Sequence, residues 1–192
     1  MSAPTRIREI PYNYTSFSDR EIIIRYLGED NWRLIESLRG SRRTGRSARM
    51  LFEVLGDMWV VSRNPYLQDD LQQNEDRRNN LIHALNQRLQ QFESRLNNNA
   101  QAEQLLLSAR DAVDQFANQF AVQINLRHKI KRALIGITRK DNVDFSGLAR
   151  VSHATDATDW RVEMPLVVIS PDDESEVAYI AQACMDCGLT II

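Results

Sequence analysis

Apolar residues recur at three- and four-residue spacing in two long stretches near the middle of the chain. The first stretch runs from about residue 75 to residue 96 and the second lies beyond residue 100; their apolar positions are Leu81, Leu85, Leu89, Phe92 and Leu96, then Leu105, Ala109, Val113, Phe116, Phe120 and Ile124. This spacing is typical of one buried face of an α-helix. A short polar turn containing "NNNA" joins the two stretches. The pattern therefore predicts an antiparallel helical hairpin.

A well-marked helix start precedes this hairpin. Ser18 can cap the helix, and Glu21 can return the bond as the other half of a capping box. Phe17 and Ile22 occupy the positions of a hydrophobic staple. Gly28 follows the last apolar residue, where a helix commonly ends.

Two more helices are predicted between Gly28 and the hairpin. The first covers residues 31–39, and its buried face is expected to carry Trp32, Ile35 and Leu38. The linker "GSRRTGRSARM" comes next. The second helix carries the stripe Met50, Leu51, Val54, Leu55, Met58 and Trp59 and is broken at Asn64-Pro65, because the residue before proline disfavours helical geometry.

The pattern changes after about residue 127. A basic helix, "RHKIKRALIGI", leads into the turn-like segment "TRKDNVDFSG". The run "PLVVIS", bounded by Pro165 and Pro171, is continuously apolar, which indicates a strand buried on both faces.

A helix and a second strand are expected after Pro171. Asp173 and Glu176 form a plausible capping pair for the helix, and Gly188 is the expected stop. The segment "LTII", residues 189–192, then reads as a second strand, parallel to the first. Such a βαβ unit needs further strands, because parallel sheets are covered on both faces.

These elements predict an α+β fold that is mainly α. The expected division is a helical domain over residues 1–126, followed by an incomplete α/β region over residues 127–192. The role of the helical domain does not follow from its pattern.

Composition narrows the class of protein. The chain has 43% hydrophobic and 26% charged residues, which is normal for a globular protein. The net charge of −2 argues against general affinity for nucleic acid. No apolar run approaches the roughly 20 residues that span a bilayer, and the first residues lack the apolar core of a secretory signal. With only two cysteines, we expect a cytoplasmic protein.

The two cysteines, Cys184 and Cys187, form a C-x-x-C motif at the end of the last predicted helix. A thioredoxin-like motif opens a helix instead, where the helix amides lower the thiol pKa. A zinc site would need a second pair of ligands, and none lies nearby. Because Cys184 falls on the apolar stripe, we interpret it as a small core residue and predict no metal site.

Two polar clusters leave alternatives open. The densest cationic run is Arg39, Arg42, Arg43, Arg46 and Arg49. It could bind a phosphate or carboxylate before a helix, or be a solvated linker whose arginines pair with acidic residues elsewhere. His153 lies among Arg150, Asp156, Asp159 and Arg161 and could be an acid/base group, although a hydrogen-bonded polar loop fits the spacing better. The sequence contains no complete catalytic constellation, so no catalytic residue is assigned.

The stretch "VSHATDATDWRVEMPLVVISPDDESEVAYIAQACMDCGLTII" resembles the start of the FAD-binding domain of FAD-linked oxidases of the vanillyl-alcohol oxidase type. It is most similar to bacterial FAD/FMN-containing dehydrogenases related to D-lactate dehydrogenase and glycolate oxidase. The upstream stretches "REIPYNYTSFSDREIIIRYLG" and "RRTGRSARMLFEVLGDMWVVSRNPYLQDDL" resemble the helical domain that precedes the flavin domain in this group.

The resemblance implies a flavoprotein oxidoreductase that passes a hydride from Cα of a 2-hydroxy acid to FAD. In such relatives a glycine-rich loop around the FAD pyrophosphate follows the positions of "GLTII", so Pro165, Pro171, Ile191 and Ile192 would flank the FAD site of the longer protein. The chain alone is expected to bind no FAD and to be inactive, because that loop and the substrate residues are missing. Its expected partner is the remainder of the flavin enzyme, with a peripheral membrane or electron-transfer partner as a further candidate.

A different class of function fits the same residues. The chain could be a free-standing interaction module, in which the hairpin and the arginine linker bind a partner or an anion. An open strand edge at residues 189–192 would then pair with another chain.

Overall fold

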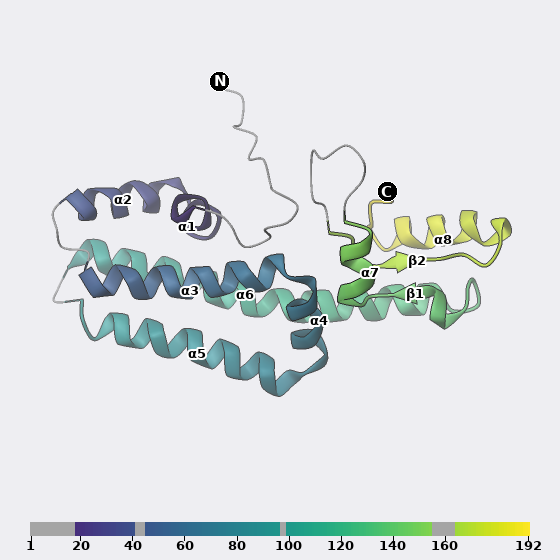
Figure 1. The fold of residues 1–192 in the computed structure, drawn as a ribbon, viewed down its shortest axis with the longest axis horizontal. Helices are drawn as coiled ribbons and strands as arrows, with labels where there is room; N and C mark the ends of the chain where they lie inside the picture. Colours follow the sequence, from purple (N-terminus) through teal and green to yellow (C-terminus); the bar gives the residue numbers. More distant parts are fainter. Residues whose placement is uncertain (1–17, 41–44, 97–98, 155–163) are drawn as a thin grey trace, which may run out of the picture. The chain divides into compact units, whose positions relative to one another are not determined.

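The computed structural model describes residues 18–40, 45–96, 99–154 and 164–192 (Figure 1). The described residues belong to two compact units. Of the described residues, the helical unit comprises those within 18–64 and 71–119, and the C-terminal unit comprises those within 65–70 and 120–192. Each unit has its own buried side chains.

The helical unit is built mainly from five helices. They are α1 (Asp19–Leu27), α2 (Glu29–Gly40), α3 (Gly45–Arg63), α5 (Glu75–Glu93) and the first part of α6 (Ala100–Ala133). Of these, α3, α5 and α6 run side by side (Figure 1). The predicted apolar stripes form its core: the buried side chains include Trp32, Ile35, Leu51, Val54, Leu55, Met58, Leu85, Leu89, Val113 and Phe116. The predicted helical positions of these residues are confirmed.

Side-chain bonds link neighbouring helices of this unit. The Tyr26 hydroxyl lies 2.9 Å from Ser62 Oγ, which connects α1 to α3. The Asn31 side-chain amide donates to Ser108 Oγ at 3.2 Å, which connects α2 to α6. Arg110 and Glu93 form an ion pair at 2.7 Å across the hairpin of α5 and α6. These partners are distant in sequence, so the helical stripes alone did not identify them.

Local signals for the ends of α1 are confirmed. Ser18 is its N-cap, and the reciprocal bonds with Glu21 complete the capping box. Gly28 ends the helix with a φ of 86°, a backbone region that favours glycine. The predicted staple involves Phe17, which lies outside the described residues.

The stretch between α2 and α4 differs from the prediction in two ways. Helix α3 already begins at Gly45, so the predicted linker is shorter than expected. The break at Asn64-Pro65 is confirmed, but Pro65 also opens a further helix, α4 (Pro65–Gln73), that was not predicted. Proline is favoured at the first position of a helix, since its missing N–H would have no partner there anyway.

The hairpin of α5 and α6 is longer than its apolar stripes indicated. Helix α6 continues without interruption to Ala133, through the expected domain boundary at residues 126 and 127. No glycine or proline interrupts it before Gly136, whose φ of 79° ends the helical path. The basic segment "RHKIKRA" is therefore the last part of α6.

The C-terminal unit places small elements around the end of α6. They are the 3₁₀ turn η1 (Lys140–Asn142), β1 (Val143–Asp144), α7 (Gly147–Ser152), β2 (Val168–Ile169) and α8 (Glu174–Asp186). Their shared core contains Ile130, Leu134, Phe145, Ile180, Ala183, Cys184 and Cys187. The described residues are mostly helical with one small sheet, so the predicted α+β class, mainly α, is confirmed.

The predicted parallel pairing after α8 is not formed. Strand β2 instead pairs antiparallel with β1, with Val143 opposite Ile169, in the segment that had been interpreted as a turn. Residues 189–192 are not a strand in this structure. Gly188, with a φ of 81°, ends α8, and Leu189 N–H donates back to the Cys184 carbonyl at 3.0 Å. This Schellman motif places Leu189 against the core rather than beside β2.

Among the described helices, none combines the length and the apolar character needed to cross a bilayer.

Candidate functional site

The four residues expected to flank a flavin do not meet in one place. The Pro165 carbonyl accepts a bond from Arg150 Nε at 2.7 Å, before β2. Pro171 is exposed and precedes α8, whereas Ile191 and Ile192 follow that helix and are also exposed. The 13 residues of α8 separate Pro171 from Ile191, and at 1.5 Å per residue this helix is about 20 Å long.

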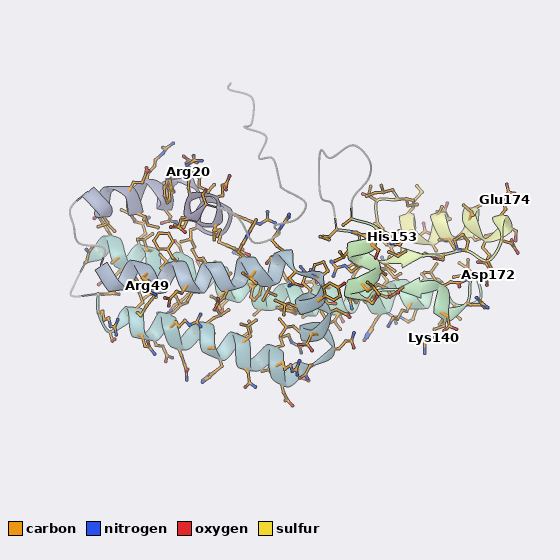
Figure 2. All side chains as sticks on the ribbon, viewed as in Figure 1. Arg20, Arg49, Lys140, His153, Asp172 and Glu174 are labelled. Carbon is orange, nitrogen blue, oxygen red and sulfur yellow. The ribbon has the colours of Figure 1, made fainter. Side chains whose placement is uncertain are left out.

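The N-terminus of α8 binds its own carboxylates. Asp173 is the N-cap and accepts from Ser175 N–H at 2.7 Å, and Glu176 accepts from Asp172 N–H at 3.1 Å. The bonds from Ser175 lower the pKa of Asp173. Asp172, which pairs with Arg139 at 2.8 Å, and the exposed Glu174 are further carboxylates at this end of the helix (Figure 2). A phosphate is therefore disfavoured here, although a helix N-terminus commonly attracts one.

A shallow hollow of about 380 Å³ lies beside this helix end, next to Gly136 and Ile137. Its other lining residues are Asp173, Ser175, Glu176 and Tyr179. The lining contains two carboxylates and no basic side chain, so it does not suit the pyrophosphate of FAD.

The C-x-x-C motif lies in the last turn of α8. Both thiols are free and buried, and burial raises the pKa of Cys184, with the neighbouring Cys187 adding to the rise. A raised pKa leaves little thiolate, which is the reactive form. The interpretation of Cys184 as a core residue is confirmed.

The arginine run is only partly described. Arg49 pairs with Glu53 one turn later in α3, at 3.0 Å, and both side chains are largely exposed (Figure 2). The side chains of Arg39, Arg42, Arg43 and Arg46 lie outside the described residues. For Arg49, the structure shows the pairing expected of a solvated surface.

The described contacts of His153 and His83 are with a carbonyl and an amide, not with a carboxylate. His153 Nδ1 lies 2.8 Å from the Ala149 carbonyl, at the end of α7. Asp156, Asp159 and Arg161, its expected neighbours, lie outside the described residues. His83 Nε2 lies 2.8 Å from the Gln87 amide nitrogen on α5.

Two arginines of the C-terminal unit, Arg127 and Arg150, are buried, whereas the sequence indicated Arg150 only as a neighbour of His153 and did not single out Arg127. Arg127 on α6 binds Asp69 of α4 at 2.9 Å and the Phe145 carbonyl at 3.2 Å. Arg150 on α7 binds Gln68 at 3.0 Å in addition to Pro165. Burial lowers the pKa of Arg150, the nearby Arg127 adds to the decrease and Asp69 opposes it, so that this pKa lies at about 10. Arg150 therefore remains charged at neutral pH.

The bonds of Arg127 and Arg150 hold α4 close to α7. A close backbone contact at the same crossing does so too. A Cβ atom on Gly147 would lie 2.8 Å from Tyr66 Cα, so only glycine leaves room at this crossing. No local sequence signal identifies the set, because its members are brought together only by the tertiary fold. Its bonds join protein groups to one another, which indicates a structural role.

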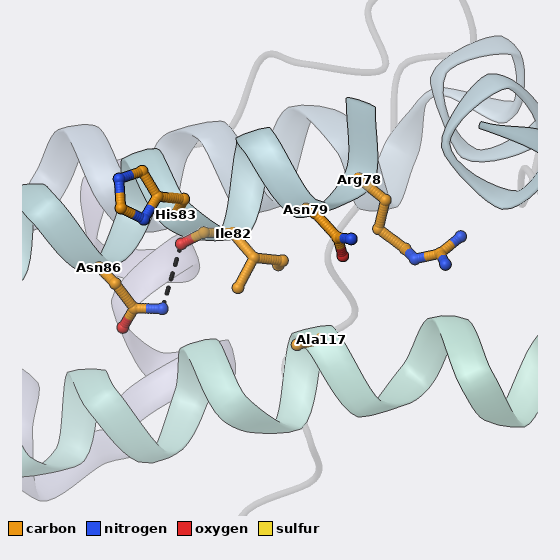
Figure 3. A pocket seen from close by; sticks show the side chains of 6 residues that line it. All are labelled: Arg78, Asn79, Ile82, His83, Asn86 and Ala117. Atoms are coloured by element: carbon orange, nitrogen blue, oxygen red, sulfur yellow. Dashed lines mark hydrogen bonds between the residues drawn. The ribbon is translucent and has the colours of Figure 1, made fainter. Parts of the chain in front are cut away.

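The helical unit carries a groove between α5 and α6 (Figure 3). Its lining residues are Arg78, Asn79, Ile82, His83 and Asn86 from α5 and Ala117 from α6. The groove has a volume of about 370 Å³. It mixes polar groups from one helix with a small apolar floor.

A comparison with protein families finds a match for the helical part of the chain. Residues 5–118 match the family described as "Protein of unknown function (DUF3683)". The chain belongs to the DUF3683 family. No curated protein and no solved structure matches the chain. All six lining residues of the α5–α6 groove fall within the DUF3683 region.

Proposed function

We propose that the chain is the N-terminal part of a FAD-linked oxidoreductase that acts on a 2-hydroxy acid such as D-lactate or glycolate. Residues of the DUF3683 region form its helical domain, and β2 and α8 belong to the start of its FAD-binding domain. The proposal rests on the sequence resemblance, and one feature of the C-terminal unit supports it.

That feature is the second apolar face of α8. One face, with Ile180, Ala183, Cys184 and Cys187, packs into the core. A second face carries Val177, Ala178, Ala181 and Met185, and the side chains of Val177 and Met185 are 49% and 63% exposed. So broad an apolar surface on one helix is suited to contact with a second packing partner beyond the core of this unit.

The distribution of exposed apolar side chains agrees with this. Among the large apolar side chains that are exposed in the described residues, only Leu107 belongs to the helical unit. The others belong to the C-terminal unit, and its sheet has two strands of two residues each. So small a sheet gives little independent stability, which favours completion by further strands.

A flavin bound to the longer protein would need groups that bind its pyrophosphate. The acidic N-terminus of α8 does not suit a pyrophosphate, so these contacts must come from residues outside the described ones. The role of the chain is then to build the layer on which the flavin domain packs, and FAD supplies the redox chemistry.

The test uses the complete gene product that contains this chain. It should purify with bound FAD, and Met185→Lys should lower the FAD content, because a charge would be placed between packed layers. Gln182→Lys, at an exposed polar position of the same helix, is the matched control and should retain FAD. A gene product without flavin would contradict the proposal, and would favour the interaction module. Equal FAD content in both variants would remove the support from α8.

A further inference from the structure

The α5–α6 groove lies where α6 presents only the short side chain of Ala117 to α5. Ala117 is the contribution of α6, and Ile82 points from α5 toward it (Figure 3). The volume of about 370 Å³ lies at the lower end of the range for small-molecule sites, roughly 300–1,000 Å³. The groove can therefore hold a small ligand with an apolar part of a few carbon atoms.

The polar groups of the groove are mainly hydrogen-bond donors. Arg78 is held in place because its Nη1 donates to the Leu71 carbonyl at 2.9 Å. Its Nη2 lies 4.0 Å from Glu75, a carboxylate that is 77% exposed and so neutralises the guanidinium only weakly. The Asn86 amide nitrogen donates to the Ile82 carbonyl at 3.1 Å, which fixes its orientation.

The lining has a definite charge preference. It contains one permanent cation, Arg78, together with two amides and an imidazole, and it contains no carboxylate. A guanidinium presents its N–H groups in a planar fork that matches the two oxygens of a carboxylate. Asn79, the next residue on α5, also lines the groove, and its amide is a further hydrogen-bond donor.

We propose that this groove binds a small organic carboxylate, with the carboxylate at Arg78 and Asn79 and a short apolar body over Ile82 and Ala117. The site belongs to the helical unit, and it does not depend on the flavin proposal. The same chemistry is offered by a free acid or by the C-terminal residue of a peptide, and the test separates these two sources.

The test is an NMR titration of the chain at constant ionic strength with three probes. Butyrate supplies the carboxylate and a short apolar body, butyramide supplies the same body without charge, and N-acetyl-trialanine supplies a peptide carboxylate. Butyrate should give saturable shifts at the side-chain amides of Asn79 and Asn86. Butyramide should bind at least about tenfold more weakly, because it loses the charge-assisted bonds to Arg78.

Two variants locate the binding. Ala117→Leu fills the floor of the groove without removing a polar group and should weaken butyrate binding at least about tenfold. Gln115→Leu adds the same side chain at an exposed position of α6 outside the groove lining and should leave binding unchanged. Tighter binding of N-acetyl-trialanine at the same residues would assign the site to a peptide terminus. Absence of saturable shifts with both carboxylates, or equal affinities for butyrate and butyramide, would overturn the proposal.

Discussion

Gly147 is the position where a single added methyl group should destabilise the C-terminal unit most directly. The Cβ atom of Gly147→Ala would lie 2.8 Å from Tyr66 Cα and 2.9 Å from Tyr66 N. Both are backbone atoms in the first turn of α4, so the contact cannot be relieved by rotating a side chain. Either α4 or α7 must move, and the bonds from Arg127 to Asp69 and from Arg150 to Gln68 cross the same contact.

The expected loss of stability in Gly147→Ala follows from the cost of overpacking. Forcing a methyl group into a filled space costs about 1–3 kcal/mol. Alanine is the better helix former, but its advantage over glycine is at most about 1 kcal/mol in a helix interior, and Gly147 is only the first residue of α7. We therefore expect a net loss of stability in the C-terminal unit.

Native-state hydrogen exchange measures this loss of stability separately for the amides of each helix. Amides of α7 and of the first turn of α4 should lose protection by roughly 5- to 150-fold, which corresponds to about 1–3 kcal/mol. Gly56→Ala is the matched control, because a Cβ there meets nothing within 4 Å in the middle of α3. It should raise protection of α3 instead, by about 0.5–1 kcal/mol. Unchanged or increased protection around Gly147→Ala would refute the reasoning.

Four other predictions follow from the described contacts. Ser18→Ala removes the capping box of α1 and should lower the free energy of unfolding of the helical unit by about 1 kcal/mol, measured by urea unfolding with tryptophan fluorescence. Burial raises the pKa of Tyr26, so the contribution of this residue to stability is present below the unfolded pKa near 10 and is lost as the pH rises through the folded pKa. In Tyr26→Phe, the free energy of unfolding should therefore fall less steeply above pH 10, as measured by urea unfolding at each pH. Arg127→Met removes the guanidinium that binds Asp69 and should lower the stability of the C-terminal unit, measured by hydrogen exchange, by less than the about 3–5 kcal/mol of an isolated buried pair, because Arg150 still interacts with Asp69. Adding Asp69→Asn should recover part of this loss, whereas an additive double variant would contradict the pairing. The pKa of Asp173 is lowered, so its capping stabilises α8 above the unfolded pKa and is lost as pH falls through the folded pKa; Asp173→Ala should lower the protection of α8 amides at neutral pH and remove this pH dependence.

The sequence predicted the elements whose signals are local. The capping box at Ser18, the stops at Gly28 and Gly188, and the helical stripes around Leu55 and Leu85 depend on residues within a few positions of one another. Helix periodicity and capping are determined by such neighbours, so one sequence suffices to identify them.

Pairing between distant segments was not predictable in the same way. An apolar run such as "PLVVIS" indicates a strand but does not specify its partner, and β2 pairs with β1 rather than with residues 189–192. The burial of Arg127 and Arg150 was not predictable from the sequence, because the partners that bury them lie on α4. The α5–α6 groove also depends on a residue from each of two helices, Ile82 and Ala117.

The flavin proposal is tested most directly by an anaerobic titration of the complete gene product with D-lactate and with glycolate. The bound flavin should lose its visible absorbance as one of these 2-hydroxy acids transfers a hydride to it, and the absorbance should return when air is admitted. A gene product that carries no flavin, or whose flavin keeps its absorbance in the presence of 2-hydroxy acids, would contradict the proposed function.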